Sequence, residues 1–158
     1  MKSLVIAAMV LTPAVAHAGV QFAGAHAAYS IGGAVVNGPG DGARSALDLG
    51  AAFGWFSHEK AKYLPEEKGP TGGVSLVTGF GTSPTLFALE LGYASDVQIS
   101  GLSVCIGPVL QVDPSTHAGG TFRATFDFAF AQVGLRLDVV GRENPELSLA
   151  ATIGVGPF

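Results

Sequence analysis

Charged residues are scarce in this chain. Asp, Glu, Lys and Arg together make up 13% of the 158 residues, which is about half their usual share in a soluble domain. Hydrophobic residues make up 48%, and the mean hydropathy is +0.44. The formal net charge of −4 and the lack of basic clusters argue against a nucleic-acid partner. Such a composition is more typical of a membrane protein than of a soluble one.

The chain also lacks the uninterrupted run of about 18 apolar residues that a transmembrane helix needs. The nearest candidate is the N-terminal segment MKSLVIAAMVLTPAVAHA. It has a positive charge at Lys2, a short apolar run over 4–11, and small residues at Ala16 and Ala18. This pattern predicts a secretory signal peptide over residues 1–18, cleaved after Ala18. An N-terminal membrane anchor is the alternative, but the apolar run is too short to span a bilayer. The remaining residues, 19–158, form one predicted domain.

Cysteine is nearly absent, and histidines are few. Cys105 is the only cysteine, so an intramolecular disulfide is impossible. Its place in the strand pattern predicts a buried thiol rather than a reactive or dimer-forming one. Beyond the predicted signal peptide, the histidines are His26, His58 and His117, which lie far apart and lack the spacing of metal ligands. We therefore predict no metal site, no cofactor and no cofactor-binding residues.

What the chain does contain is alternation of period two, which is typical of β-strands. In TFDFAFA, for example, Phe126, Phe128 and Phe130 alternate with Asp127 and Ala129. The pattern predicts strands joined by turn-like segments, of which 58–73 is the longest and 113–120 is another. The predicted strands are 20–36, 44–57, 73–81, 85–95, 101–112, 121–131, 132–140 and 146–156.

The two faces of these strands differ in a way that favours a membrane barrel. One face carries bulky apolar residues, and the other carries mostly Gly, Ala and Ser. A water-facing sheet would instead carry many Lys, Glu, Thr and Arg residues. Small residues suit the crowded inside of a narrow barrel, and bulky apolar ones suit lipid. The predicted fold is all-β, an antiparallel transmembrane β-barrel of eight strands. A soluble periplasmic barrel or sandwich that binds a ligand is the alternative, with the Phe and Leu face turned inward.

A few charges interrupt the small-residue face of the strands. Facing lipid at mid-depth, each arginine would cost about 2–4 kcal/mol, whereas in a polar lumen the charges can pair. We predict an internal network in which the two arginines neutralise several acids. An ion path or an acid/base site is one interpretation, and a plug that satisfies its own hydrogen bonds is the favoured one. The predicted lumen residues are Asp48, Glu90, Arg123, Asp127, Arg136 and Asp138.

Two points of strand organisation stay open from the sequence. The apolar phase changes from even to odd positions at Ala131 and Gln132, which indicates either a tight turn between two strands or a β-bulge in one long strand. In addition, an eight-strand count places segment 58–73 at the end that carries the chain termini. Barrels of this kind normally have short turns at that end.

The predicted signal peptide, the eight alternating segments over 19–158 and the terminal Phe158 together resemble the small outer-membrane β-barrel proteins of Gram-negative bacteria. The resemblance implies a location in the outer membrane, contact with its lipid, and recognition by the barrel-assembly machinery during biogenesis. At eight strands the side chains fill the inside of a barrel, so we predict a plugged lumen rather than an open porin-like channel. The predicted role is structural, envelope-integrity or surface-interaction.

An enzymatic role is the competing prediction. Some barrels of this kind are enzymes that add or remove acyl chains on lipopolysaccharide, using Ser and His near the outer rim. The run Ser57-His58-Glu59 contains suitable residue types, but neighbours on a strand point to opposite faces and cannot form a triad. No motif matches those enzymes, so we predict no catalytic residues. The alternative enzyme would place His58 or His117 at the rim.

Overall fold

A computed structural model describes residues 22–36, 43–54, 57–60, 65–80, 84–97, 100–113, 116–141 and 143–156. Over these ranges the chain is almost entirely β-structure, and none of its elements is a helix. The strands are β1 (Phe22–Val36), β2 (Arg44–Gly54), β3 (Ser57–Lys60), β4 (Pro65–Gly79), β5 (Thr85–Val97), β6 (Ser100–Asp113), β7 (His117–Phe128), β8 (Ala131–Val140) and β9 (Glu146–Val155). Among the described residues, none forms a helix that is long and apolar enough to cross a bilayer.

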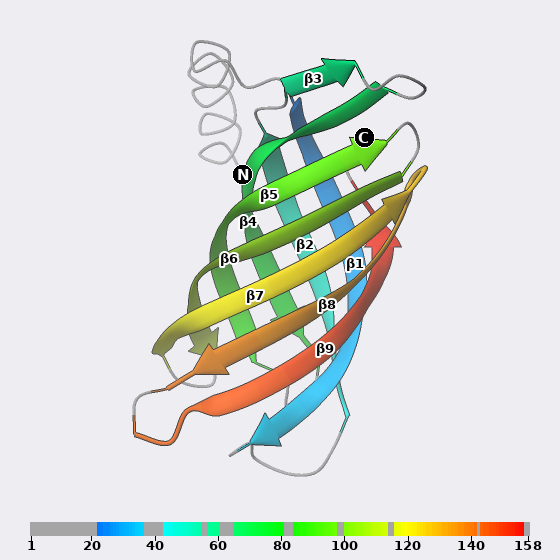
Figure 1. Ribbon diagram of the computed structural model, residues 1–158. Helices are drawn as coiled ribbons and strands as arrows, with labels where there is room; N and C mark the ends of the chain where they lie inside the picture. The colour runs from blue at the N-terminus through cyan, green and yellow to red at the C-terminus, as the bar shows by residue number, and fades with distance from the viewer. Residues whose placement is uncertain are drawn as a thin grey trace, which may run out of the picture.

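The sheet closes on itself into a barrel (Figure 1). Its strands follow the order β2-β1-β9-β8-β7-β6-β5-β4-β3, and a further pairing of β2 with β4 closes the ring. All neighbouring strands run antiparallel. The short strand β3 pairs with β4 beyond the end of β2, so eight strands form the barrel wall. The predicted eight-stranded antiparallel barrel fold is confirmed.

The register around the ring fixes the tilt of the strands. A path across the ladders that leaves β1 at Ala23 returns to β1 at Gly33, a stagger of 33 − 23 = 10 residues. With the usual strand spacing and rise, this stagger corresponds to a tilt of about 40° from the barrel axis. A barrel of this size is filled by its own side chains.

The two faces of the wall lie as the alternation predicted. Phe126, Phe128 and Phe130 point outward, with exposed fractions of 47%, 54% and 67%. On β8, Leu135 is exposed while Arg136 is buried in the lumen. Bulky apolar side chains therefore cover the outside, and small or polar ones fill the inside.

The phase change near residue 131 is a tight turn and not a bulge. Phe128 at the end of β7 pairs directly with Ala131 at the start of β8, so Ala129 and Phe130 alone make the turn. Ala129 has a φ of 50°, in the left-handed region that costs a residue with a Cβ about 1–2 kcal/mol. The outward side chains are even-numbered before this two-residue turn and odd-numbered after it, which accounts for the change of phase.

Replacing Ala129 with Gly should therefore stabilise the protein by about 1 kcal/mol, because glycine adopts this φ without a steric penalty. The measurement is the free energy of unfolding by urea in phospholipid vesicles. Gly141→Ala is the matched reverse change, since Gly141 has a φ of 111° and a Cβ there would meet no atom closer than 3.6 Å. It should destabilise by a similar amount, and a loss of stability in Ala129→Gly would contradict the strain at this turn.

The prediction that 58–73 is a connecting segment was wrong for most of its length. Residues 57–60 form β3, and β4 already begins at Pro65. The Pro and Gly residues of the segment suggested turns, but those from Pro65 onward lie within β4, and Gly72 and Gly73 lie where neighbouring backbone approaches closely. A Cβ on Gly73 would lie 2.6 Å from the carbonyl oxygen of Ala51. The charged residues of 65–68 continue the strand past the last residue of β2, toward the barrel end.

The prediction that 113–120 is a connection also needs correction, because β7 starts at His117 and not at residue 121. Gly119 and Gly120 pair with Val140 and Val139 of β8. A methyl group on Gly119 would overlap the carbonyl oxygen of Val139. Glycine is thus required there by close approach of two strands rather than by a turn.

Figure 1 shows that β1 begins and β9 ends at the same end of the barrel, here called the terminal end. Strand β3 and the start of β4 project from this terminal end (Figure 1). The sequence-based strand count therefore placed segment 58–73 correctly, at the end that carries the chain termini. The predicted signal peptide over 1–18 and the final residues 157–158 lie outside the described residues.

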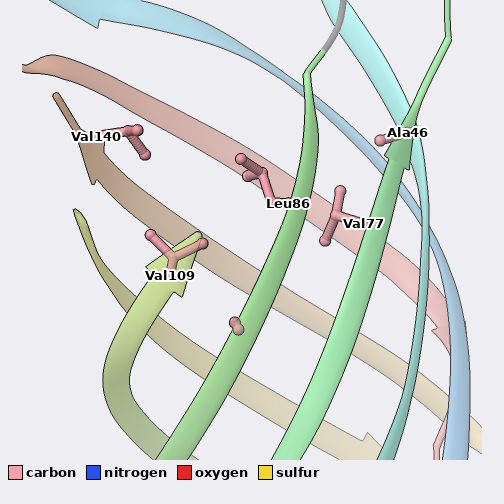
Figure 2. Close-up of a cluster of buried hydrophobic side chains, with 6 residues drawn as sticks. Ala46, Val77, Leu86, Val109 and Val140 are labelled. Atoms are coloured by element: carbon pink, nitrogen blue, oxygen red, sulfur yellow. The ribbon is translucent and has the colours of Figure 1, made fainter. Parts of the chain in front are cut away.

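A layer of buried apolar side chains, drawn in Figure 2, lies inside the barrel toward the opposite end. The residues come from strand segments next to the β1–β2, β4–β5, β6–β7 and β8–β9 connections, which lie at the end away from the termini. The layer consists of Ala46, Val77, Leu86, Ala88, Val109 and Val140. Nearer the same end, the Arg44 guanidinium contacts the Glu146 carboxylate.

Candidate functional site

The candidate site is a group of buried charges in the lumen, on the terminal-end side of the apolar layer. Strand alternation places these side chains, because each holds an inward-facing position of its own strand. Asp48 and Arg136 are the most deeply buried, with exposed fractions of 1% and 2%. The other members are Glu90, Arg123 and Asp138.

Arg123 on β7 is the hub of this group. Its Nη2 atom donates to Asp48 Oδ2 at 2.8 Å and to Ser75 Oγ at 3.1 Å. Its Nε atom lies 3.2 Å from Glu90 Oε1. A single guanidinium thus joins β7 to β2, β4 and β5 across the inside of the barrel. Charge-assisted bonds of this kind are about twice as strong as neutral ones.

Arg136 on β8 forms the second half of the group. Its Nε atom donates to both carboxylate oxygens of Asp138, at 2.9 and 3.0 Å. Residues two apart on a strand share a face, which is why these two side chains meet. The Arg136 Nη1 atom also lies 3.6 Å from Asp48 Oδ2. Asp48 is therefore shared between the two arginines.

Asp127 is the one predicted lumen residue that stands apart. It faces inward near the terminal end, where its Oδ1 atom accepts a hydrogen bond of 2.9 Å from Gln132 Nε2. A Cβ on Gly156 would overlap the same carboxylate oxygen. The structure therefore brings together five of the six predicted residues, Asp48, Glu90, Arg123, Arg136 and Asp138, and leaves Asp127 outside their network.

Sequence reasoning missed two polar members of the site. His26 Nε2 lies 2.9 Å from Arg123 Nη1 and 3.3 Å from Asp48 Oδ1, and Ser75 accepts from Arg123. The inward phase of β1 could have identified His26, because it alternates with the outward Ala25 and Ala27. Its partners lie 97 and 22 residues away in the chain, so no local spacing connects them.

The other residues considered from the sequence lie apart from this network. Cys105 is a buried free thiol, as its strand phase predicted. His117 is exposed at the first position of β7. The backbone of Ser57, His58 and Glu59 lies in β3, and their side chains lie outside the described part. Across the described ranges, no cluster of three or more His, Cys, Asp and Glu residues is arranged to hold a metal ion.

The arrangement is chemically a set of electrostatic cross-links. Each buried carboxylate of the network faces at least one guanidinium. The two arginines come from the neighbouring strands β7 and β8 and reach side chains of β2, β4 and β5. Removing one charge from such a set leaves its partners buried and unpaired, which is costly. The group can therefore hold the strands at fixed positions and fill the lumen.

Comparison with known proteins gives a likeness of fold. No protein-family model matches the chain, and no curated protein matches it. Among solved structures, the chain is similar to Ail, the attachment invasion locus protein of Yersinia pestis, which was crystallised in complex with the heparin analogue sucrose octasulfate. The identity is 10%, the TM-score is 0.52, and the match covers 84% of this chain and 96% of that one.

The chain is also similar to the outer membrane enzyme PagL. The identity is 11%, the TM-score is 0.51, and the match covers 84% of this chain and 99% of that one. At such identities the likeness concerns the barrel fold alone. One neighbour is named for attachment and invasion and the other is an enzyme, so this fold supports more than one activity.

Proposed function

We propose that this chain is an outer-membrane β-barrel protein of a Gram-negative bacterium, with a structural, envelope-integrity or surface-interaction role and a lumen plugged by its own side chains. The observation that carries the proposal is the polarity of the barrel, which is apolar outside and charged inside. The similarity in fold to Ail and to the outer membrane enzyme PagL is consistent with it.

The outer face is unsuited to water. Large apolar side chains project from every strand of the wall, including Leu91 at 59%, Ile106 at 62% and Ile153 at 63% exposed. Soluble monomers rarely expose continuous apolar surface on this scale. A closed barrel pairs its backbone polar groups between strands and can therefore lie in lipid. The soluble alternative required the Phe and Leu face to turn inward, which is the opposite of the observed arrangement.

The inside is unsuited to diffusion of solutes. The charged network spans the middle of the lumen. The apolar layer, drawn in Figure 2, lies inside the barrel toward the end away from the termini. We expect the purified protein to produce no stable ion-conducting steps in planar lipid bilayers. Regular conductance steps from the folded protein would contradict the plugged lumen.

The carboxylates of the network are paired with arginines, which favours a structural role over acid/base catalysis at this cluster. For that reason we propose no catalytic residues. The role that remains is to anchor the barrel and its exposed connections in the membrane. Biogenesis would involve cleavage after Ala18 and insertion by the barrel-assembly machinery, with outer-membrane lipid as the permanent partner. N-terminal sequencing of the exported protein should begin at Gly19.

Fractionation and gel mobility test the proposal together. The protein should sediment with outer membranes, require detergent for extraction, and migrate differently in SDS gels before and after boiling. A folded barrel resists SDS until it is heated, which is the reason for the shift. Extraction by buffer alone, together with identical mobility of boiled and unboiled samples, would overturn it.

A further inference from the structure

The imidazole of His26 lies between a hydrogen-bond donor and a hydrogen-bond acceptor. Its Nε2 atom is 2.9 Å from Arg123 Nη1 and 3.3 Å from Asp48 Oδ1. A guanidinium only donates hydrogen bonds, and an ionised carboxylate only accepts them. Nε2 therefore needs a lone pair to bond Arg123 and a proton to bond Asp48. One nitrogen cannot satisfy both neighbours at the same time.

The two bonds connect different strands. When Nε2 is unprotonated, the bond from Arg123 ties β7 to β1 across the lumen. When Nε2 is protonated, the ring donates to Asp48 on the adjacent strand β2, and the imidazolium repels the guanidinium. Protonation at one atom thus exchanges a cross-barrel contact for a contact between neighbouring strands.

Arg123 has a second acceptor within reach. Glu90 Oε1 lies 3.2 Å from Arg123 Nε, yet both atoms are buried without a hydrogen-bond partner. A small rotation of the guanidinium would convert this ion pair into a hydrogen bond. Releasing Arg123 from His26 therefore does not leave its charge without a partner.

Charged groups face the ring from several strands. His26 faces Asp48 from β2, Arg123 and Asp127 from β7, and the wider network of Glu90 on β5 and Arg136 with Asp138 on β8. From β9 the nearest inward position is Gly154, which pairs with Ala28 and carries no charge. Within the network, two guanidinium groups face three carboxylates, and a protonated His26 supplies the third positive charge.

Gly50 provides the space in which the ring sits. It pairs with His26 across the β1–β2 ladder. A Cβ at this position would overlap the imidazole Cε1 atom and would also lie 2.6 Å from the carbonyl oxygen of Val74. The ring is therefore held against the backbone of β2 with Nε2 directed toward Asp48 and Arg123. Displacing the ring would separate Nε2 from both partners.

We propose that His26 is a proton-operated switch in the lumen. An unprotonated Nε2 accepts a hydrogen bond from Arg123 and ties β7 to β1, whereas a protonated Nε2 donates to Asp48 and releases Arg123 toward Glu90. The switch involves only contacts inside the barrel, so it does not depend on the proposed location of the protein in the outer membrane.

Nitrogen-15 NMR of the folded protein in detergent micelles tests the switch, with labelled His and Arg followed over the whole pH range in which the barrel stays folded. His26→Gln and Arg123→Lys assign the two side chains. In the neutral ring, Nε2 should resonate far downfield, as an unprotonated acceptor does, with the proton on Nδ1. The Arg123 side-chain signals should then move with the same midpoint as His26. A neutral ring protonated at Nε2, or Arg123 signals that do not shift when His26 is protonated, would overturn the proposal.

Three further variants separate the switch from simple loss of structure, with the heat-dependent gel shift reporting on folding. Glu90→Gln should retain the His26 titration but reduce the response of Arg123. Gly50→Ala should displace the ring and abolish the coupling between the two side chains. Gly73→Ala is the matched control, because a Cβ there would lie equally close to a backbone carbonyl, 2.6 Å from the oxygen of Ala51, without meeting the ring. Its coupling should be unchanged. If the coupling between His26 and Arg123 is unaltered in Gly50→Ala, the proposed position of the ring against Gly50 is wrong.

Discussion

Replacing Arg123 with Met should lower the free energy of unfolding by about 3–5 kcal/mol, the usual cost of leaving a buried charge without its partner. The arginine neutralises Asp48 and lies against Glu90, and all three side chains are at least nine-tenths buried. Methionine fills much of the same volume, so the lost charge dominates the effect. The measurement is reversible urea unfolding in phospholipid vesicles, followed by the fluorescence of Trp55, the only tryptophan.

Two variants control for the volume and the charge of this side chain. Arg123→Lys keeps the charge but loses the planar fork that reaches Asp48 and Ser75 together, so its loss of stability should be smaller. The double change of Arg123→Met with Glu90→Gln removes one stranded carboxylate and should recover part of the loss. A loss below about 1 kcal/mol in Arg123→Met would show that the network does not hold the barrel together.

Replacing Leu135 with Arg should destabilise the vesicle-embedded protein by about 2–4 kcal/mol, the cost of arginine on the lipid face near the middle of a bilayer. Leu135 lies midway along β8, points outward, and is 54% exposed. Water around the same site would not penalise the charge in this way. The same unfolding experiment in vesicles measures the effect.

Phe130→Arg is the matched control for depth. Phe130 also points outward, at 67% exposed, but it lies in the turn between β7 and β8 at the terminal end. Near the membrane interface the cost of arginine falls to roughly 1 kcal/mol or less. Equal and small effects at the two positions would indicate that both face water, and they would contradict the proposed membrane location.

The faces of the strands could be predicted from the sequence because burial in a barrel wall follows a period of two. That period alone was enough to place Phe126 and Leu135 on the outer face of the wall and Arg136 on the inner face. The same reasoning placed the network residues inside and predicted the number of strands. It did not decide between a turn and a bulge at residue 131, because both produce the same phase change.

Segment 58–73 shows where local signals fail. Its Pro and Gly residues favour turns when read alone, yet Gly73 is required by the approach of the Ala51 backbone, which only the closed barrel creates. His26 was missed for a related reason. Its contacts with Arg123 and Asp48 arise from strand pairing around the barrel. The spacing of residues in a single sequence does not reveal that pairing.

Collision measurements on spin labels test the membrane-spanning arrangement most directly. The only native thiol, Cys105, is buried, so Cys105→Ala provides a background for labels at Leu91, Leu135, Ile153 and, at the rim, Phe130. In reconstituted vesicles, labels at the three mid-strand positions should collide often with oxygen and rarely with a water-soluble nickel chelate, while the Phe130 label should meet the chelate more often. Frequent chelate collisions at Leu91, Leu135 and Ile153 would show that water covers the apolar face, and the barrel would then not span a membrane.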